Sequence, residues 1–198
     1  MVIDLPSYWH KKREIMEYYD RLADTYNSLY LDEQILKIKY IFTHVKIHYS
    51  DLILDAGCGT GFLFRSIYPF AGHIIGVDLS KEILKVALAN VKHFGMKRIS
   101  LIRADVDFLP FREKVFHKVF VLTLLQDSPK IDMTLREISR TATDESIIVV
   151  TGLKKLFSEK SLKQAIIKGR LNPTIIQTQE QIKDIIAICL KNIKVKNK

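Results

Sequence analysis

The hydrophobic positions along the chain predict two helices, followed by an alternation of short strands and helices. Apolar and aromatic residues from Ile15 to Leu29 recur at spacings of three and four, which indicates one amphipathic helix. A second stripe, from Ile35 to Val45, predicts another helix. Short apolar runs then predict strands at 52–54, 73–77, 99–102, 115–125 and 147–150, and the stretches between and after them predict helices beginning at Gly61 and spanning 80–94, 133–140, 156–170 and 179–190.

These apolar runs are continuous, which is typical of strands buried on both faces of a parallel sheet. Helices that connect parallel strands cross over in the right-handed sense and cover both faces of the sheet. The pattern therefore predicts an α/β fold with a doubly covered, mainly parallel sheet. Its ligand site should lie beyond the carboxyl ends of the strands, where the winding direction reverses.

A glycine-rich turn follows the first predicted strand and opens a helix. It has the sequence Asp55-Ala56-Gly57-Cys58-Gly59-Thr60-Gly61, and its glycines allow a sharp turn and close approach of a ligand to the backbone. A dinucleotide-binding turn places its third glycine three residues after the second, whereas Gly61 follows Gly59 by two. The acid before the first glycine would repel a pyrophosphate, but it suits a ligand that carries an ammonium or sulfonium group.

Two further acids follow the next two predicted strands. Asp78 lies about 20 residues after Gly57, a spacing that allows a carboxylate at the neighbouring strand end to accept from both hydroxyls of a ribose. Asp105 follows the third strand, where it would accept a hydrogen bond from an adenine amino group. Taken singly, Asp78 or Asp105 could instead be a helix N-cap or a solvated loop residue.

The glycine turn, Asp78 within Gly76-Val77-Asp78-Leu79-Ser80, and Asp105 together resemble class I S-adenosylmethionine-dependent methyltransferases over roughly residues 15–150. Residues 19–27, Tyr-Asp-Arg-Leu-Ala-Asp-Thr-Tyr-Asn, are similar to the start of the ubiquinone/menaquinone-type methyltransferases, which cover the cofactor with such a helix. The resemblance implies a Rossmann-like methyltransferase sheet with helices on both faces and an N-terminal helical cap. It also implies S-adenosyl-L-methionine as the cofactor.

The resemblance implies which residues would hold the methionine end of this cofactor. Asp55 and the backbone of Gly57-Cys58-Gly59 would hold it from the first strand end, and Thr123 would meet the methionyl amino group from the fourth. Tyr19 and Tyr26 would cover it. The alternative for these two tyrosines is a stripe that faces the core.

The adenosine half is assigned by the same resemblance. Asp78 would bind the ribose, with Leu79 against the adenine face. Asp105 would accept from the adenine amino group, and the backbone of Val106 would meet the edge of the ring.

The sequence departs from the family pattern in two places. His117 stands where the family usually has an acid, at a position that is normally structural. The family sheet ends with two strands after the last helix, whereas only Asn192–Val195 is a clear strand candidate here. The sheet therefore has six strands, or seven if a segment such as Thr174–Thr178 supplies another.

Composition and charge indicate how the chain is divided into parts and what kind of partner it binds. The chain of 198 residues is expected to form one domain, with a helical cap at 1–48, a cofactor-binding core at 49–151 and a basic part at 152–198. The net charge is +9, and residues 151–198 hold 11 lysines and arginines against three acids. This asymmetry indicates a polyanionic partner, or else a lysine-rich solvated surface.

Other sequence features exclude several classes of protein. Two cysteines cannot form a disulfide scaffold, which favours a cytoplasmic location. No secretory signal and no apolar run long enough for a membrane helix is seen. The six histidines are scattered and neither cysteine has a partner at metal-ligand spacing, so no metal site is expected.

The acceptor of the methyl group is less defined. A chain this short leaves no room for a large lid, so an open acceptor face is expected. The open face and the basic C-terminal part together favour a base in rRNA or tRNA as the acceptor, including an exocyclic amine such as cytosine N4. A small molecule or quinone precursor is the alternative, and a non-enzymatic binding module is a third. If the acceptor is an amine, Gln126 or Asp127 would accept a hydrogen of the nitrogen that attacks the methyl group, unless Asp127 and Ser128 cap the next helix.

Overall fold

The computed structural model describes residues 5–191, whose strands form a single seven-stranded sheet. Its strands are β1 (Leu52–Ala56), β2 (His73–Asp78), β3 (Ile99–Arg103), β4 (Phe116–Val121), β5 (Ala142–Leu153), β6 (Leu171–Ile176) and β7 (Asp184–Lys191). Its helices are α1 (Leu5–Leu22), α2 (Tyr26–Phe42), α3 (Phe62–Ile67), α4 (Lys81–His93), α5 (Ile131–Thr141) and α6 (Glu159–Lys168), with a short 3-10 turn, η1 (Leu125–Asp127).

The strand order is β3-β2-β1-β4-β5-β7-β6. Strands β1 to β5 pair in parallel, and β7 lies antiparallel between β5 and β6. The α/β fold with a mainly parallel sheet is therefore confirmed, and the sheet has seven strands. The segment considered for the seventh strand, Thr174–Thr178, overlaps the end of β6, while Asn192–Val195 lies outside the described residues.

The helix predicted at 179–190 is wrong, because most of this segment forms β7. The strand is enclosed between β5 and β6, and Ile186, Ala187 and Cys189 are buried in it. A short apolar run of this kind fits a buried strand as well as a helix, and only the two neighbouring strands decide between them.

The single helix predicted from Ile15 to Leu29 is also wrong, because the chain breaks there into α1 and α2. Thr25 separates them, and its hydroxyl donates to Leu22 O at 3.2 Å while its carbonyl accepts from Ser28 Oγ at 2.8 Å. Such side-chain bonds offer the backbone an alternative to a continuous helix. The apolar spacing nevertheless runs across the break, so the pattern alone did not reveal it.

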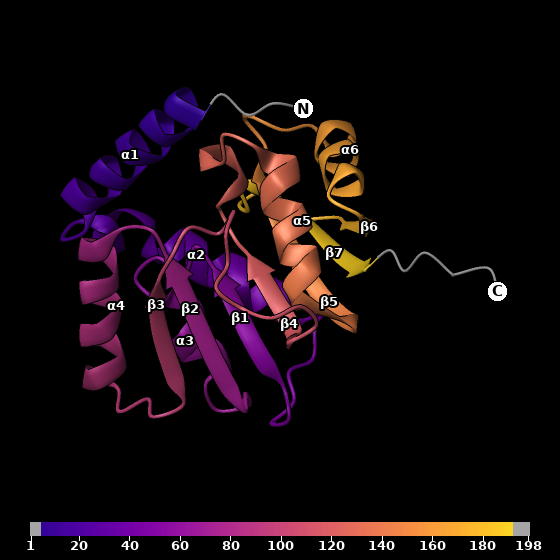
Figure 1. Ribbon diagram of the computed structural model, residues 1–198. Coiled ribbons are helices and arrows are strands. Elements are labelled where there is room, and N and C mark those ends of the chain that lie inside the picture. Colours follow the sequence, from indigo (N-terminus) through magenta and orange to yellow (C-terminus); the bar gives the residue numbers. More distant parts are fainter. Residues whose placement is uncertain (1–4, 192–198) are drawn as a thin grey trace.

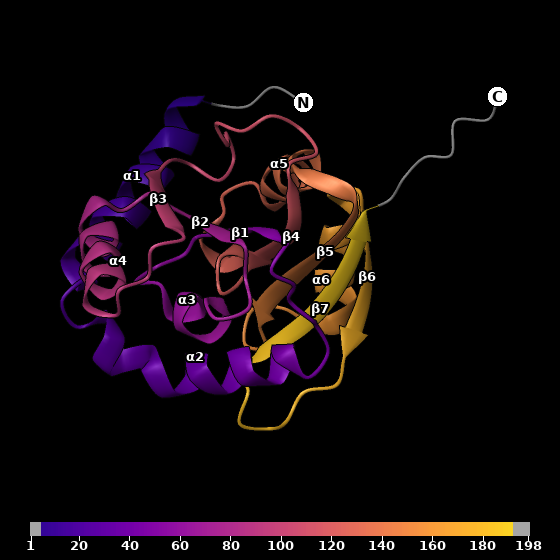
Figure 2. The same ribbon diagram turned by 90° about the horizontal axis from the view of Figure 1, so that it is seen from below.

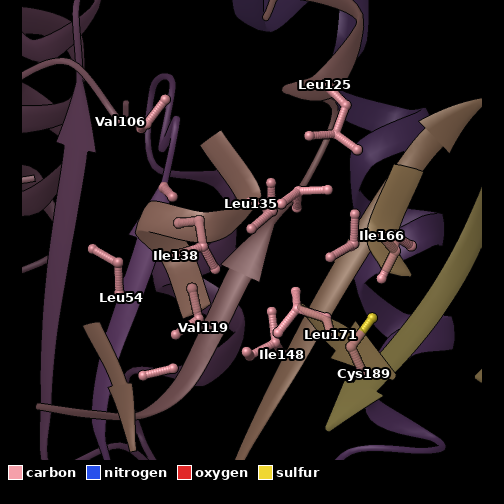
Figure 3. Close-up of a cluster of buried hydrophobic side chains, with 14 of the residues drawn as sticks. Leu54, Val106, Val119, Leu125, Leu135, Ile138, Ile148, Ile166, Leu171 and Cys189 are labelled. Carbon is pink, nitrogen blue, oxygen red and sulfur yellow. The ribbon is translucent and has the colours of Figure 1, made fainter. Parts of the chain in front are cut away.

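Two apolar layers hold the helices against the sheet. On one face, Leu135 and Ile138 of α5 and Ile166 of α6 pack on Leu54, Val119 and Ile148 (Figure 3). On the other face, α2, α3 and α4 pack around residues such as Ile41, Phe64 and Val91. Figure 2 shows α5 on one side of β1 and β4, with α2 and α3 on the other. The fold thus buries both faces, as continuous apolar strands require.

Helix α1 stands apart from these layers. Figure 1 shows it across the end of the sheet to which the arrowheads of β2 and β4 point. These are the carboxyl ends of the parallel strands, where a ligand site is expected. In the part of the chain that the structure describes, no helix is both long and apolar enough to cross a membrane.

Candidate functional site

A cleft of about 700 Å³, partly open to solvent, lies between α1 and the carboxyl ends of β1 to β4. Ten of the residues singled out in the sequence line it, although they come from segments far apart in the chain: Tyr19, Tyr26, Gly57, Gly59, Asp78, Leu79, Asp105, Val106, Thr123 and Asp127. Asp55 and Cys58 line a smaller adjoining pocket of about 330 Å³, which shares Tyr26, Gly57 and Gly59 with the cleft. Gln126 lines neither; it borders a groove outside.

The glycine turn connects β1 to α3 and forms the floor of the cleft. The amides of Gly57 and Cys58 both donate to Val77 O, at 2.8 and 2.9 Å, which fixes the turn against β2. Gly57 has a φ of +74°, and a Cβ there would lie 2.8 Å from Leu124 Cδ1. Only glycine satisfies both conditions, so the backbone remains open to a ligand at this point.

Asp55 lies beneath this turn with 3% of its surface exposed. Burial, with a smaller contribution from the charge of Asp78, raises the pKa of its carboxyl to about 8. A cation bound nearby would favour the ionised form, which is the electrostatic behaviour expected of a group that faces an ammonium or a sulfonium.

Asp78 is fixed at the end of β2 by two backbone amides. Gly59 N donates to Oδ2 at 2.9 Å and Ser80 N donates to Oδ1 at 3.0 Å. Each carboxylate oxygen keeps a further lone pair for a hydroxyl. The N-cap of α4 is Ser80, whose Oγ accepts from Ile83 N, so Asp78 is not the cap. Burial raises its pKa, against the opposing effect of the amides.

Asp105 is paired on one side only. Its Oδ1 accepts from Lys12 Nζ at 2.8 Å and from Asp107 N at 3.0 Å, whereas its Oδ2 is buried and has no hydrogen-bond partner among residues 5–191. An unpaired buried acceptor is costly, so this oxygen is a place for a ligand donor. The residues present therefore fit an adenosyl group, because Oδ2 of Asp105 can accept a hydrogen bond where an adenine amino group is expected.

Thr123 follows β4 in a left-handed conformation, with a φ of +54°, which is rare for a β-branched residue. Its amide donates to Thr151 Oγ1 at 2.8 Å, and its Oγ1 accepts from Lys37 Nζ at 2.6 Å and Gln34 Nε2 at 3.2 Å. Lys37 is fully buried and forms an ion pair with the equally buried Asp184 at 2.6 Å. Residues of α2 and β7 thus support the conformation of Thr123.

Helix α1 is held over the cleft by polar contacts. Tyr19 donates to Asp127 Oδ2 at 2.7 Å, and Asp20 Oδ1 accepts from Ser80 Oγ at 2.5 Å and Glu82 N at 3.1 Å. At the start of α2, Tyr26 stacks on Phe62 and lies over Gly59. Tyr19 and Tyr26 therefore face the cleft and are not merely core residues. Helix α1 thus covers part of the cleft, as expected of the N-terminal helical cap.

The two proposed catalytic residues are neighbours with different surroundings. Asp127 reaches the cleft, and burial raises the pKa of its carboxyl while the hydrogen bonds of Tyr19 and Gln126 oppose that rise. Gln126 donates to Thr123 O through Nε2, and its buried Oε1 has no hydrogen-bond partner in the described part of the chain. The capping alternative is wrong: α5 begins after its N-cap residue Lys130, whose side chain makes no capping hydrogen bond.

Sequence reasoning missed Lys12, Asp20 and Lys37. Lys12 lies on the same face of α1 as Tyr8 and Tyr19, and Lys37 interrupts the buried face of α2 beside Ile38. A lysine at a position of an apolar stripe is the signal that could have found both, because a buried lysine needs a carboxylate partner. Asp20 belongs to the motif at residues 19–27, but the sequence assigned no role to it.

Two smaller expectations concern histidines and metals. His117 Nδ1 accepts from Leu52 N at 3.0 Å, a contact between the starts of two strands and away from the cleft. Among residues 5–191, no group of three or more His, Cys, Asp or Glu side chains could hold a metal ion.

Comparison with known proteins gives the family. Residues 47–191 match the family model described as a methyltransferase domain. An uncharacterized protein of Methanocaldococcus jannaschii is 30% identical over 82% of this chain and 62% of its own, and a demethylmenaquinone methyltransferase of Lactobacillus johnsonii is 28% identical over 65% and 56%. The chain thus spans less than two thirds of the length of either curated relative.

Among solved structures, a SAM-dependent methyltransferase from Aquifex aeolicus superimposes with a TM-score of 0.73 at 13% identity, over 89% of this chain and 98% of that one. At this identity the likeness shows the fold alone. The family model covers most of the chain, and the glycine turn and acids of that family meet in one cleft. The chain belongs to the family of class I S-adenosylmethionine-dependent methyltransferases.

Proposed function

We propose that the protein transfers the methyl group of S-adenosylmethionine to a small organic acceptor. The observation that carries this proposal is the covered cleft, which Asp78 and Asp105 line where an adenosine is expected, with Oδ2 of Asp105 left without a partner among the described residues. Asp55 and Thr123 stand at the end where a methionyl group would lie. When bound, the cofactor supplies a methyl group activated by the positive sulfur, and the electron pair of the broken S–C bond goes to sulfur.

The protein's residues would then align the acceptor and exclude water. Asp127 lies at the edge of the cleft, where its carboxylate would accept the proton that the acceptor atom loses as its bond to the methyl carbon forms. Tyr19 holds Asp127 in place through its hydroxyl. The neighbouring Gln126 has an oxygen, Oε1, without a partner among residues 5–191, but it does not line the cleft. We assign the catalytic role to Asp127 and a positioning role to Tyr19.

A small acceptor can reach Asp127 without displacing the contacts of α1, which favours it over a macromolecule whose bulk would extend over that helix. The Lactobacillus johnsonii relative is named for demethylmenaquinone, which agrees with this preference. The preference for RNA that the charge suggested is therefore reversed here.

RNA remains the second candidate, because six basic residues in and around α6 are exposed: Lys154, Lys155, Lys160, Lys163, Lys168 and Arg170. In this case the acceptor would be a base in rRNA or tRNA. These side chains would bind phosphates, and Gln126 or Asp127 would accept from an exocyclic amine.

The deciding experiment uses the purified protein and S-adenosylmethionine labelled in its methyl group. Calorimetry with S-adenosylhomocysteine first tests the cleft, with ATP and NADH as controls that should not bind. Label is then followed into small-molecule and RNA fractions of a cell extract, with nucleoside mass spectrometry on the RNA. Label confined to a methylated nucleoside would overturn the small-molecule proposal. If S-adenosylhomocysteine does not bind, both the small-molecule and the RNA proposals are overturned.

A further inference from the structure

A second hollow, the outer groove, adjoins the cleft on the side of η1. It encloses about 840 Å³, much of it open to solvent, between Ser7, Tyr8 and Lys11 of α1 and the segment 126–130. Asp127 lines both the cleft and the outer groove. The groove therefore adjoins the point at which the proposed reaction removes a proton, and nothing above assigns it a ligand.

The charges of the outer groove are unequal. Lys11 and Lys130 line it from opposite walls, and within residues 5–191 neither has a carboxylate oxygen within the 4.0 Å of an ion pair. The single carboxylate among the lining residues, Asp127, already accepts from Tyr19 at 2.7 Å. Two lysines that line one hollow, without an ion-pair partner among residues 5–191, favour an anion between them.

The walls of the groove are held in place from behind. Tyr8 is buried, and its hydroxyl donates to Asp107 Oδ2 at 2.5 Å, while the neighbouring Lys12 pairs with the same carboxylate at 2.7 Å. On the other wall, Ser128 Oγ lies 2.6 Å from Thr134 Oγ1 of α5. Since both walls have these anchors, the fold fixes the backbone from which the side chains of Lys11 and Lys130 extend.

We propose that the outer groove binds the acceptor, and that this acceptor is a small organic anion carrying a carboxylate or phosphate group. Lys11 and Lys130 pair with the anionic group, which orients the nucleophilic atom toward Asp127 and the cleft. The inference rests on the proposed function, since it places the acceptor beside the cofactor. The six basic residues of the α6 region do not line this groove, so the groove itself serves a ligand with one or two charges.

The test measures binding of matched probes to protein saturated with S-adenosylhomocysteine. Benzoate and benzamide have nearly the same shape and differ in charge, and inorganic phosphate is a second anion. Benzoate should bind at least about tenfold more tightly than benzamide, as one charge-assisted hydrogen bond allows. The Lys11→Gln/Lys130→Gln variant should lose this preference, whereas the control Lys160→Gln/Lys163→Gln, with the same charge change on α6, should keep it.

The affinity for S-adenosylhomocysteine separates the possible failures. If it is absent, the proposed function itself fails. If it is normal in every variant but benzoate and benzamide bind equally, or neither binds, or the groove variant keeps the preference, only the inference is overturned. A short single-stranded RNA that displaces benzoate more strongly per phosphate than inorganic phosphate does would also overturn it, in favour of a nucleic acid in the groove.

Discussion

Three carboxylates meet in the site, and each is prepared in a different way. Backbone amides orient Asp78, Lys12 holds one oxygen of Asp105, and burial keeps Asp55 largely protonated near neutral pH. The sequence predicted that these acids would gather, because strand ends of a parallel sheet share an edge. It could not predict their partners, since Lys12 reaches Asp105 from a helix 93 positions away.

The first prediction concerns Asp78. Replacing Asp78 by Ala should weaken S-adenosylhomocysteine binding by about 10- to 150-fold, the range expected for charge-assisted hydrogen bonds to two hydroxyls. Isothermal titration calorimetry measures the change, and Asp24→Ala, an exposed acid in the turn before α2, is the matched control. An affinity unchanged in Asp78→Ala would exclude the ribose role.

The second prediction concerns Asp55 in the ligand-free protein. Its pKa rises from 3.8 to about 8 on folding, so between these values the native state binds a proton that the unfolded chain has released. The free energy of unfolding should therefore fall as the pH rises through this window, by up to about 1.4 kcal/mol per unit.

Urea unfolding of the wild type and of Asp55→Asn, from about pH 5 to about pH 8, checks this dependence. Asp78 also has a raised pKa and acts in the same direction, so the test is the difference between the two proteins. The slope of the wild type should be the steeper one, and parallel slopes would contradict the prediction.

At the scale of the elements, periodicity located β1 to β4, the central part of β5, and helices α4, α5 and α6 within a few residues. It failed at two places, for different reasons. The break at Thr25 depends on local side-chain bonds, and β7 depends on two neighbouring strands that are distant in sequence. The apolar spacing at both places is compatible with a helix, so no pattern of single residues could have corrected it.

The link between α2 and β7 leads to a third prediction. Lys37→Met should lower the free energy of unfolding by about 3–5 kcal/mol, because it leaves Asp184 buried without its partner. Lys39→Met, on the exposed side of the same helix, should change it little. Adding Asp184→Leu should restore much of the loss, and a double variant as unstable as the single one would mean that the carboxylate is not the cause.

The docking of α1 leads to a fourth prediction. Asp20→Ala removes two hydrogen bonds to the start of α4, so the lid should open more often and S-adenosylhomocysteine should dissociate about 3- to 10-fold faster. Stopped-flow measurement of the dissociation rate tests this, with the exposed Glu17→Ala on the same helix as control. Equal dissociation rates would show that α1 does not gate the cleft.

At the scale of the whole molecule, the uneven charge distinguishes the two candidate acceptors. A basic surface that binds RNA neutralises several phosphates, so RNA affinity should fall steeply with salt concentration. A small acceptor held by two lysines should show a much weaker dependence. Acceptor affinity measured across a salt series decides between them, and a steep dependence for the methylated compound itself would return the preference to RNA.

The position of β7 in the sheet has a consequence for synthesis on the ribosome. The strand nearest the end of the described chain is inserted between β5 and β6, and Asp184 within it is the partner of a lysine 147 positions earlier. A nascent chain can assemble β1 to β5 as they emerge, but the edge of β5 stays unpaired until residues 184–191 follow. Translational pausing before that point would leave a partly folded intermediate whose unpaired β5 edge can bind chaperones or aggregate.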